Sequence, residues 1–395
     1  MKFTYRNPTR IIFGIGEFEQ LGSEAATIGR HALLVTGKSS ARKLGFTERA
    51  KRLLQAAGVE ITLFEEIEPN PRTTTIERAA DLVREQGCDF VIGLGGGSPM
   101  DSAKGIAVAA SNDGPFWDYV SHGDPDNQRQ PQRALPIVTV PTLAATGSEA
   151  NCGGVFTNWE SNEKAALFNP LVYPVFTVID PQLTVAVSPE YTGDGGVDII
   201  SHCLERYFSS AVQTPVQDSF IEGVVRAVMS YLGRAMQDGS DLEARTHLSW
   251  ASTVALQGLV GAGKLGGFPL HAMEHALSAH YDISHGRGLA ILFPHLMRFT
   301  AEKFPEQYAT FAKHVFFKNT DGMTISEAAE QGISLFEDWL DSVGMKLRLS
   351  DVGIGAERIE RMADDVLRVN GSDGVLANRR PMKRGDIISV YRAAL

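Results

Sequence analysis

A change of hydrophobic periodicity along the chain most constrains how this sequence can fold. From about residue 30 to residue 180, short runs rich in Val, Ile, Leu and Phe alternate with helical patterns. The runs that we expect to be strands are residues 31–36, 59–64, 89–94 and 135–140. Strands that alternate with helices are typical of βαβ units and a mostly parallel sheet. This half is therefore predicted to be a Rossmann-like α/β domain.

The second half of the chain has a different pattern. After the stretch 174–191 the strand signal fades, and apolar residues recur three and four positions apart, as in QDSFIEGVVRAVMSYLGRAM. This spacing is typical of amphipathic helices. A chain of 395 residues also exceeds the ~250–300 residues at which single cores stop growing. We expect an α/β domain over residues 1–187 and an all-helical domain over residues 188–395.

Charge and cysteine usage narrow the class of partner. The formal net charge of −10 argues against nucleic acid and anionic membranes, which are normally bound by basic patches. No run of eighteen apolar residues predicts a membrane span. Cys88, Cys152 and Cys203 form no CxxC pair, which favours a reducing compartment. We therefore expect a cytoplasmic protein that binds small molecules.

A glycine-rich segment, DFVIGLGGGSPMDSAKG, runs from an expected strand into a helical pattern. Ser98 suits a helix N-cap, Pro99 the first helical position, and Asp101 the acidic position of a capping box. Glycines let phosphate oxygens approach the N–H groups at a helix N-terminus. A pyrophosphate would fit here. The segment matches neither of the two commonest nucleotide motifs, however, so a plain tight turn stays open.

A second polar segment, PTLAATGSEAN at residues 141–151, also follows an expected strand. Its hydroxyl and amide donors are Thr142, Thr146, Ser148 and Asn151. An open α/β sheet binds its ligand at loops that follow the carboxyl ends of parallel strands. Taken together, the two segments favour a nucleotide site.

A possible metal site lies in the helical half. Asp198 and His202 are four residues apart, so they share one helix face. The segment HAMEHALSAHYDISHGRG contains four more histidines, which are His271, His275, His280 and His285. Three imidazoles and one carboxylate would suit Zn²⁺ or Fe²⁺ better than Mg²⁺ or Ca²⁺. Alone, the pair Asp198 and His202 could also be a surface interaction.

The histidine segment has a competing interpretation. Residues 271–275, HAMEH, match H-x-x-E-H, a zinc-peptidase pattern in which both histidines bind zinc and the glutamate acts as base. This interpretation predicts a zinc hydrolase with Glu274 as its base. It leaves the glycine and threonine segments unexplained.

Four motifs in order make the pattern specific. They are GGGSPMDSAK, PTLAATGSEAN, D-x-x-x-H at Asp198, and two histidines fourteen apart, His271 and His285. Together they resemble the iron-containing (group III) alcohol dehydrogenase family, most closely its NADPH-dependent butanol dehydrogenase and aldehyde reductase branch. The resemblance covers nearly the whole chain.

The resemblance implies a dehydroquinate synthase-like architecture. It also implies a metal-dependent alcohol dehydrogenase or aldehyde reductase that transfers hydride between NAD(P)H and a small primary alcohol or aldehyde. Within the same architecture, a glycerol-type polyol dehydrogenase and a dehydroquinate synthase-like lyase stay open.

The resemblance also assigns residues. The implied ligands of Fe²⁺ or Zn²⁺ are Asp198, His202, His271 and His285, and His275 is implied near the nicotinamide as a proton relay or substrate contact. The implied dinucleotide contacts are Asn70, Gly96, Gly97, Ser98, Asp101, Thr142, Thr146, Ser148, Asn151, Lys164 and Leu183. A homodimer through the N-terminal strand region is implied as well. We expect Glu274 at the rim of the pocket, and Lys104 and His280 in solvent.

Cofactor choice is predicted from the loop after the first expected strand. NAD-linked relatives in this family carry an aspartate there, and a carboxylate repels the 2′-phosphate of NADP. Here the position is Gly37, followed by Lys38, Ser39 and Ser40. The loop therefore predicts that NADP(H) is preferred over NAD(H). A polar turn that only caps the next helix is the alternative.

Overall fold

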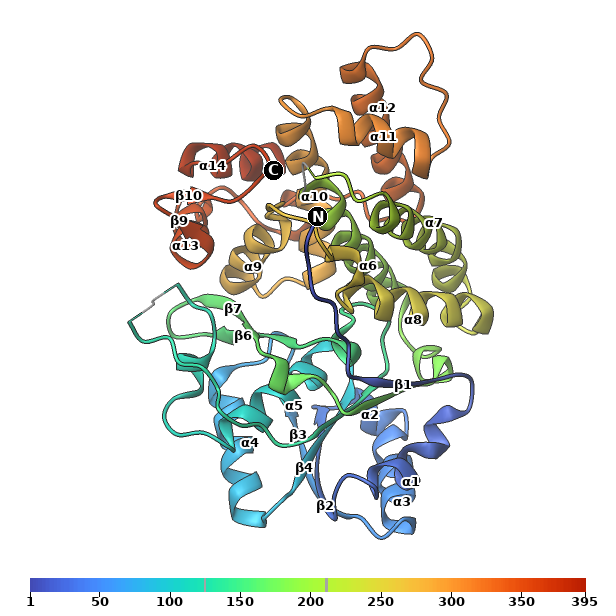
Figure 1. The fold of residues 1–395 in the computed structure, drawn as a ribbon, viewed down its shortest axis with the longest axis vertical. Coiled ribbons are helices and arrows are strands. Elements are labelled where there is room, and N and C mark those ends of the chain that lie inside the picture. The colour runs from blue at the N-terminus through green and yellow to red at the C-terminus, as the bar shows by residue number, and fades with distance from the viewer. Residues whose placement is uncertain (124–125, 210–211) are drawn as a thin grey trace. The chain divides into compact units, whose positions relative to one another are not determined.

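The chain forms two compact units, each assembled from separate stretches (Figure 1). The computed structural model describes residues 1–123, 126–209 and 212–395. The α/β unit contains Arg6–Val187 and Gly239–Gln257. The helical unit contains Met1–Tyr5, Ser188–Asp238 and Gly258–Leu395. The predicted single boundary after Val187 therefore places two segments in the wrong unit. Met1–Tyr5 belongs to the helical unit, and Gly239–Gln257 belongs to the α/β unit.

The α/β unit is built on a parallel sheet of six strands in the order β1-β8-β5-β4-β2-β3. The strands are β1 (Arg10–Phe13), β2 (His31–Gly37), β3 (Glu60–Ile67), β4 (Phe90–Gly95), β5 (Ile137–Pro141) and β8 (Phe176–Ile179). All six residues of β4 are buried. Such continuous burial is typical of a parallel sheet covered on both faces. The predicted sheet is confirmed.

Helices cover both faces of this sheet. They are α1 (Leu21–Ala25), α2 (Ser40–Lys43), α3 (Phe46–Ala56), α4 (Thr73–Gln86) and α5 (Gly97–Ala109), while α8 (Leu242–Leu256) packs against the segments that follow β5 and β8. Helices α1 and α3 lie together on one side of the sheet, and α4 and α5 on the other (Figure 1). Phe18, Leu21 and Leu54 pack with strand residues such as Phe90 and Ile92 in the main core. The core therefore fixes the strands whose carboxyl ends carry the polar loops.

The α/β unit also contains an antiparallel hairpin that the sequence did not predict. Strands β6 (Gly153–Asn158) and β7 (Glu163–Phe168) pair in register from Gly153 with Phe168 to Asn158 with Glu163. Glycine, glutamate and lysine are poor strand formers, so this stretch lacks a strand signal. Its pairing depends on contacts with the rest of the unit.

The helical unit contains eight helices longer than one turn in the part of the chain that the structure describes. These are α6 (Pro189–Ser209), α7 (Pro215–Gln237), α9 (Leu270–Tyr281), α10 (His285–Ala301), α11 (Glu306–Val315), α12 (Ile325–Ser342), α13 (Ile359–Asn370) and α14 (Arg384–Ala393). A small antiparallel pair, β9 (Gly371–Ser372) and β10 (Val375–Leu376), is the exception to the predicted all-helical domain.

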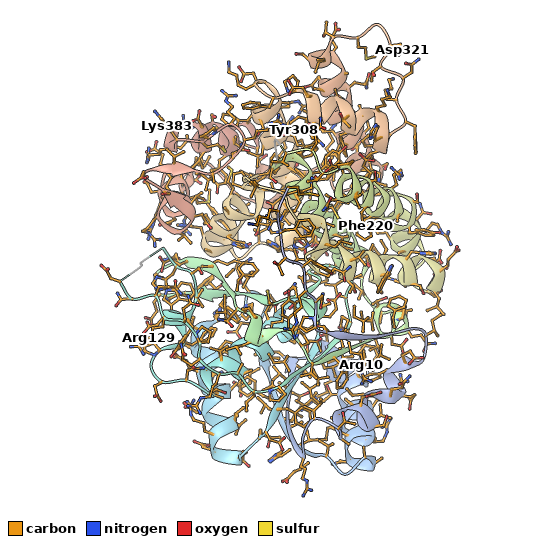
Figure 2. All side chains as sticks on the ribbon, viewed as in Figure 1. Arg10, Arg129, Phe220, Tyr308, Asp321 and Lys383 are labelled. Carbon is orange, nitrogen blue, oxygen red and sulfur yellow. The ribbon has the colours of Figure 1, made fainter. Side chains whose placement is uncertain are left out.

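Aromatic packing builds the interior of the helical unit. Tyr308, labelled in Figure 2, stacks on Phe208 with ring centroids 4.3 Å apart, so it joins α11 to α6. Phe208 also contacts Phe268 and Phe311. Helix α6 is thereby held firmly in the unit. Of the helices that the structure describes, none combines the length and apolar character needed to cross a bilayer.

Candidate functional site

Three helices of the helical unit bring the predicted metal ligands together. Helix α6 carries Asp198 and His202 one turn apart. His271 lies in the first turn of α9, and His285 is the first residue of α10. Helix α9 ends at Tyr281, and the left-handed backbone of the following residue, Asp282 (φ 52°), turns the chain toward α10. Aspartate tolerates this conformation better than most residues.

In these four side chains, which we call the metal cluster, three imidazoles lie around one carboxylate oxygen of Asp198. Oδ1 of Asp198 lies 3.5 Å from Nε2 of His202, 3.5 Å from Nε2 of His271 and 3.7 Å from Nε2 of His285. Four donors placed tetrahedrally around Zn²⁺ at ~2.1 Å are about 3.4 Å from one another. Oδ1 of Asp198 and Nε2 of His271 are buried and have no hydrogen-bond partner among the residues described. The donor atoms of Asp198, His202 and His271 lie within 4.8 Å of one another and so could hold a metal ion, and His285 approaches the same oxygen of Asp198.

Electrostatic interactions in the cluster favour the protonation states in which two of its residues, Asp198 and His202, can bind a cation. Burial raises the pKa of Asp198, but its interactions with the neighbouring imidazoles of His202, His271 and His285 outweigh burial and hold this pKa well below its usual range. Burial lowers the pKa of His202 to about 4, against the attraction of Asp198. Burial also acts to lower the pKa of His271, but Glu205 and Asp198 raise it to about 10. Asp198 is thus ionised and His202 neutral, as cation binding requires.

Two glutamates, the fully buried Glu274 and the partly buried Glu205, contact histidines of the cluster. Oε1 of Glu205, on α6, lies 3.0 Å from Nδ1 of His271 and accepts a hydrogen bond from the backbone N–H of His271 at 2.7 Å. Glu274, on α9, pairs with Nδ1 of His285. Glu205 was not predicted from the sequence, although its position seven residues after Asp198 places both on one face of α6.

Glu274 does not lie at a pocket rim. Its side chain is fully buried, and it accepts hydrogen bonds from Ser278 and His285. The expectation of a rim position is therefore wrong, because α9 directs this residue into the protein. A peptidase base must reach a water molecule at the zinc, and a fully buried carboxylate paired with Ser278 and His285 is not placed to do so.

The other two histidines of the segment differ in their surroundings. His275 is half-buried, with its ring centroid 5.6 Å from that of His285 and 6.2 Å from that of His271. The structure therefore brings His275 beside the cluster. His280 is buried, with Nε2 2.7 Å from a carboxylate oxygen of Asp365. The expectation that His280 is exposed to solvent is wrong, because α13 supplies it with a partner.

In the α/β unit, the glycine and threonine segments meet at the carboxyl ends of the adjacent strands β4 and β5. The backbone N–H of Thr142 donates to the carbonyl of Gly95 at 2.8 Å. A Cβ atom at Gly97 would lie 2.5 Å from Cγ2 of Thr146, so the two segments touch only because residue 97 is glycine. Gly96 is more open, since its nearest neighbour is Leu143 at 3.6 Å.

The predicted capping box is absent. Helix α5 begins at Gly97, its N-cap is Gly96, and no side chain caps it. Ser98 therefore lies inside the first turn, and the expectation that it is the N-cap is wrong. Because no side chain blocks the start of α5, backbone N–H groups of this turn are left for an anion, as helix N-termini allow.

Several predicted dinucleotide contacts instead form a buried network, which we call the lysine network. Oδ1 of Asp101 accepts a hydrogen bond from Ser148 at 2.5 Å. Nζ of Lys104 donates to Oγ of Ser148 at 2.9 Å, to Oδ1 of Asn151 at 2.9 Å and to the carbonyl of Gly153 at 2.6 Å. Lys104 is fully buried, so the expectation that it is exposed is wrong. The network holds the threonine segment against α5.

The remaining predicted contacts lie on the same unit. Nζ of Lys164, on β7, donates to Oδ1 of Asn70 at 3.0 Å, so these two are brought together. Leu183 is buried in the main core. At the end of β2, Ser39 is the N-cap residue of α2 but makes no side-chain capping bond.

Comparison with known proteins agrees with these observations. Residues 8–181 match the model of the iron-containing alcohol dehydrogenase family, and residues 192–395 match the C-terminal model of Fe-containing alcohol dehydrogenases. The chain is 38% identical over 393 residues to the probable NADH-dependent butanol dehydrogenase 1 of Bacillus subtilis (strain 168), covering 100% of this chain and 99% of that protein.

Two further relatives extend the comparison. The chain is 32% identical over 360 residues to the NADPH-dependent aldehyde reductase of Escherichia coli (strain K12), covering 90% of each. The crystal structure of NADH-dependent butanol dehydrogenase A from Thermotoga maritima superposes with a TM-score of 0.93 at 34% identity, covering 100% of this chain and 98% of that one. The predicted family is confirmed, and the chain belongs to the iron-containing alcohol dehydrogenases, oxidoreductases that act on CH–OH groups.

Proposed function

We propose that this protein interconverts small primary alcohols and aldehydes by hydride transfer with a nicotinamide cofactor. The observation that carries the proposal is the convergence of Oδ1 of Asp198 with three imidazole nitrogens, those of His202, His271 and His285. We assign these four residues as ligands of Fe²⁺ or Zn²⁺, because their donor set suits both ions. A divalent cation there supplies Lewis-acid chemistry that polarises an aldehyde carbonyl and favours ionisation of an alcohol.

The side chains and loops of the protein bind and orient the reactants. We assign the dinucleotide to the carboxyl edge of the sheet, where Gly96, Gly97 and the first turn of α5 offer backbone donors to its pyrophosphate. Further proposed contacts are Gly37, Ser39, Ser40, Asn70, Ser98, Thr142, Thr146, Lys164 and Leu183. Asp101, Ser148 and Asn151 belong to the lysine network and support the site by shaping the threonine segment.

His275 is our candidate for moving the substrate proton. Its imidazole is half-buried beside His271 and His285. Imidazole exchanges protons readily near neutral pH, so a side chain in this place can accept a proton from the alcohol and return it to the product of aldehyde reduction.

Turnover with defined metals tests the proposal. Metal-free protein is reconstituted separately with Fe²⁺ and Zn²⁺, and the oxidation of NADH and of NADPH by butyraldehyde is followed by loss of nicotinamide absorbance. We expect turnover only after metal is added. Turnover of glycerol but not of butanol would favour a polyol dehydrogenase. Release from a peptide substrate would favour the zinc hydrolase, and metal-independent reduction would refute the metal cluster.

The choice between NADPH and NADH is a separate proposal. The butanol dehydrogenases similar to this chain are named NADH-dependent, whereas the aldehyde reductase is named NADPH-dependent. Because the names of these relatives differ in cofactor, the proposed preference for NADPH rests on the sequence of the loop at residues 37–40. Lys38 offers a cation, Ser39 and Ser40 offer hydroxyl groups, and the loop contains no carboxylate.

Assembly and location are two further proposals. Strand β1 is at the end of the strand order, with β8 as its one neighbour in the sheet that the structure describes. An open strand edge can pair with a second chain, so we propose a homodimer, to be tested by light scattering in solution. Cys88, Cys152 and Cys203 are free thiols, which supports a reducing compartment such as the cytoplasm.

A further inference from the structure

We infer that two carboxylates, the fully buried Glu274 and the partly buried Glu205, are positioning residues for the metal cluster and set its affinity for the cation. Glu274 holds the imidazole of His285. Glu205 holds the imidazole of His271. This inference rests on the proposed function, because it takes the two imidazoles to be ligands.

Each of these imidazoles uses its two nitrogens in opposite directions. His285 directs Nε2 toward Asp198, at 3.7 Å from Oδ1, while its Nδ1 is hydrogen-bonded to Oε2 of Glu274. His271 has Nε2 3.5 Å from the same oxygen of Asp198 and Nδ1 3.0 Å from Oε1 of Glu205. A carboxylate beside Nδ1 favours the proton on that nitrogen and leaves the lone pair of Nε2 for a cation.

The place of Glu274 is enclosed on several sides. The side chain is fully buried, and burying a carboxylate is costly unless its oxygens are paired. Here Oε1 accepts from Ser278, one turn further along α9, and Oε2 accepts from His285. A Cβ atom at Gly288 on α10 would lie 2.9 Å from Cγ of Glu274. Glycine at this position therefore leaves room for the glutamate between α9 and α10.

Glu205 contacts both the first turn of α9 and the imidazole ring of His271. Its Oε1 accepts a hydrogen bond from the backbone N–H of His271 at 2.7 Å, in the first turn of α9. The same oxygen thus bonds the main chain of His271 and lies 3.0 Å from Nδ1 of its ring. Glu205 ties α6 to α9, and Glu274 ties α9 to α10, so the three ligand-bearing helices are linked in sequence.

The third imidazole provides an internal contrast. Nδ1 of His271 lies 3.0 Å from Oε1 of Glu205 without a regular hydrogen bond, whereas no carboxylate is recorded beside the equally unbonded Nδ1 of His202 in the described part of the chain. Its position follows from α6 itself, which places His202 one turn after Asp198, and from stacking on His271 with ring centroids 4.8 Å apart. Carboxylate support is therefore found for the two ligands that come from the other helices, whose placement relative to α6 must be maintained.

Metal affinity tests the inference directly. The test variants are Glu274→Gln and Glu205→Gln, which keep the size of the side chain and remove its charge. The matched control is Glu222→Gln, since Glu222 is a buried glutamate with Oε1 2.9 Å from Nδ1 of His314 and a hydrogen bond from Tyr207. The apparent Kd for Zn²⁺ is measured by competition with a chromophoric chelator, and the geometry by the visible spectrum of the Co²⁺ protein.

We expect each test variant to raise the Kd for Zn²⁺ by about 10-fold to 100-fold and to alter the Co²⁺ spectrum. The control should stay within about twofold of the wild type, and circular dichroism of the metal-free proteins should be unchanged. Wild-type Kd and spectrum in both test variants would overturn the inference. Loss of helical signal in a test variant would also overturn it for that residue, which would then be holding the fold.

Asp198→Asn separates this inference from the proposed function. If Asp198→Asn loses Zn²⁺ while both glutamine variants keep it, the ligand set stands and the positioning roles are wrong. If Asp198→Asn also binds Zn²⁺ like the wild type, the ligand set itself is wrong, and the inference falls with it.

Discussion

The metal cluster of the helical unit and the lysine network of the α/β unit are both buried and polar, but their atoms have different partners. In the cluster, Oδ1 of Asp198 and Nε2 of His271 have no hydrogen-bond partner among the described residues. In the network, Lys104 and Asp101 both bond to Ser148. A buried polar atom costs free energy unless it is paired. The unpaired atoms therefore mark a place for a ligand, and the paired ones support the loop around a ligand.

Replacing a histidine of the metal cluster should have the largest effect on activity. His271→Ala or His285→Ala removes one of four ligands, and we expect metal-dependent aldehyde reduction to fall by more than about 100-fold, beyond the effect of an outer contact. NADPH binding, measured by fluorescence titration, should persist because the proposed cofactor contacts lie in the α/β unit. His247→Ala, at an exposed histidine on α8, is the control. Wild-type metal content and turnover in either test variant would contradict the ligand set.

Replacing Lys104 should instead affect the lysine network of the α/β unit. Lys104→Met leaves Ser148, Asn151 and Asp101 without their buried cation, and breaking such a pairing costs about 3–5 kcal/mol. We expect a lower midpoint of urea unfolding and weaker NADPH binding, with metal content unchanged. Lys51→Met is the control, because Lys51 forms a surface pair with Glu48, which is worth at most about 1 kcal/mol. Unchanged nucleotide affinity would show that the network does not support the cofactor site.

The same lysine predicts a pH dependence of stability. Burial lowers the pKa of Lys104 from 10.5 to about 8, against the attraction of Asp101 and Glu149. Between these two values the unfolded chain binds more protons than the folded chain, so the free energy of unfolding rises with pH, by at most about 1.4 kcal/mol per unit. Lys104→Met should lose this rise when urea unfolding is compared across the window. Parallel pH profiles for the two proteins would contradict a lowered pKa.

The comparison also explains how much the sequence could predict. The spacing of Asp198 and His202 predicted their convergence, because positions four apart on a helix share a face. The functions of Ser148 and Asn151 were not predictable in the same way. Their partner Lys104 is 44 and 47 residues away in sequence, and no local pattern determines such contacts.

The same distinction applies to burial and to secondary structure. Periodicity predicted the parallel sheet, because covered parallel strands are continuous apolar runs. It did not predict that Glu274 and His280 are buried, since each polar side chain takes its partner from another helix, His285 on α10 and Asp365 on α13. Polar residues are usually exposed, so sequence alone favours the wrong expectation for both.

The smallest expected effect concerns cofactor choice. It tests whether the α/β unit distinguishes the 2′-phosphate of NADPH in addition to binding the pyrophosphate. A Cβ atom at Gly37 would have its nearest neighbours at 3.7 Å and 3.9 Å, the carbonyl of Ile67 and Oγ of Ser40, so the Cβ of an aspartate makes only ordinary contacts there. A preference for NADPH of about tenfold requires only about 1.4 kcal/mol. Gly37→Asp should reduce that preference, chiefly by raising KM for NADPH, because the carboxylate repels the 2′-phosphate. The measurement is kcat/KM with each cofactor, and Gly37→Asn, which adds the same volume without charge, is the matched control. Equal use of NADH and NADPH by the wild type, or the same ratio in the aspartate variant, would mean that this loop does not distinguish the two cofactors.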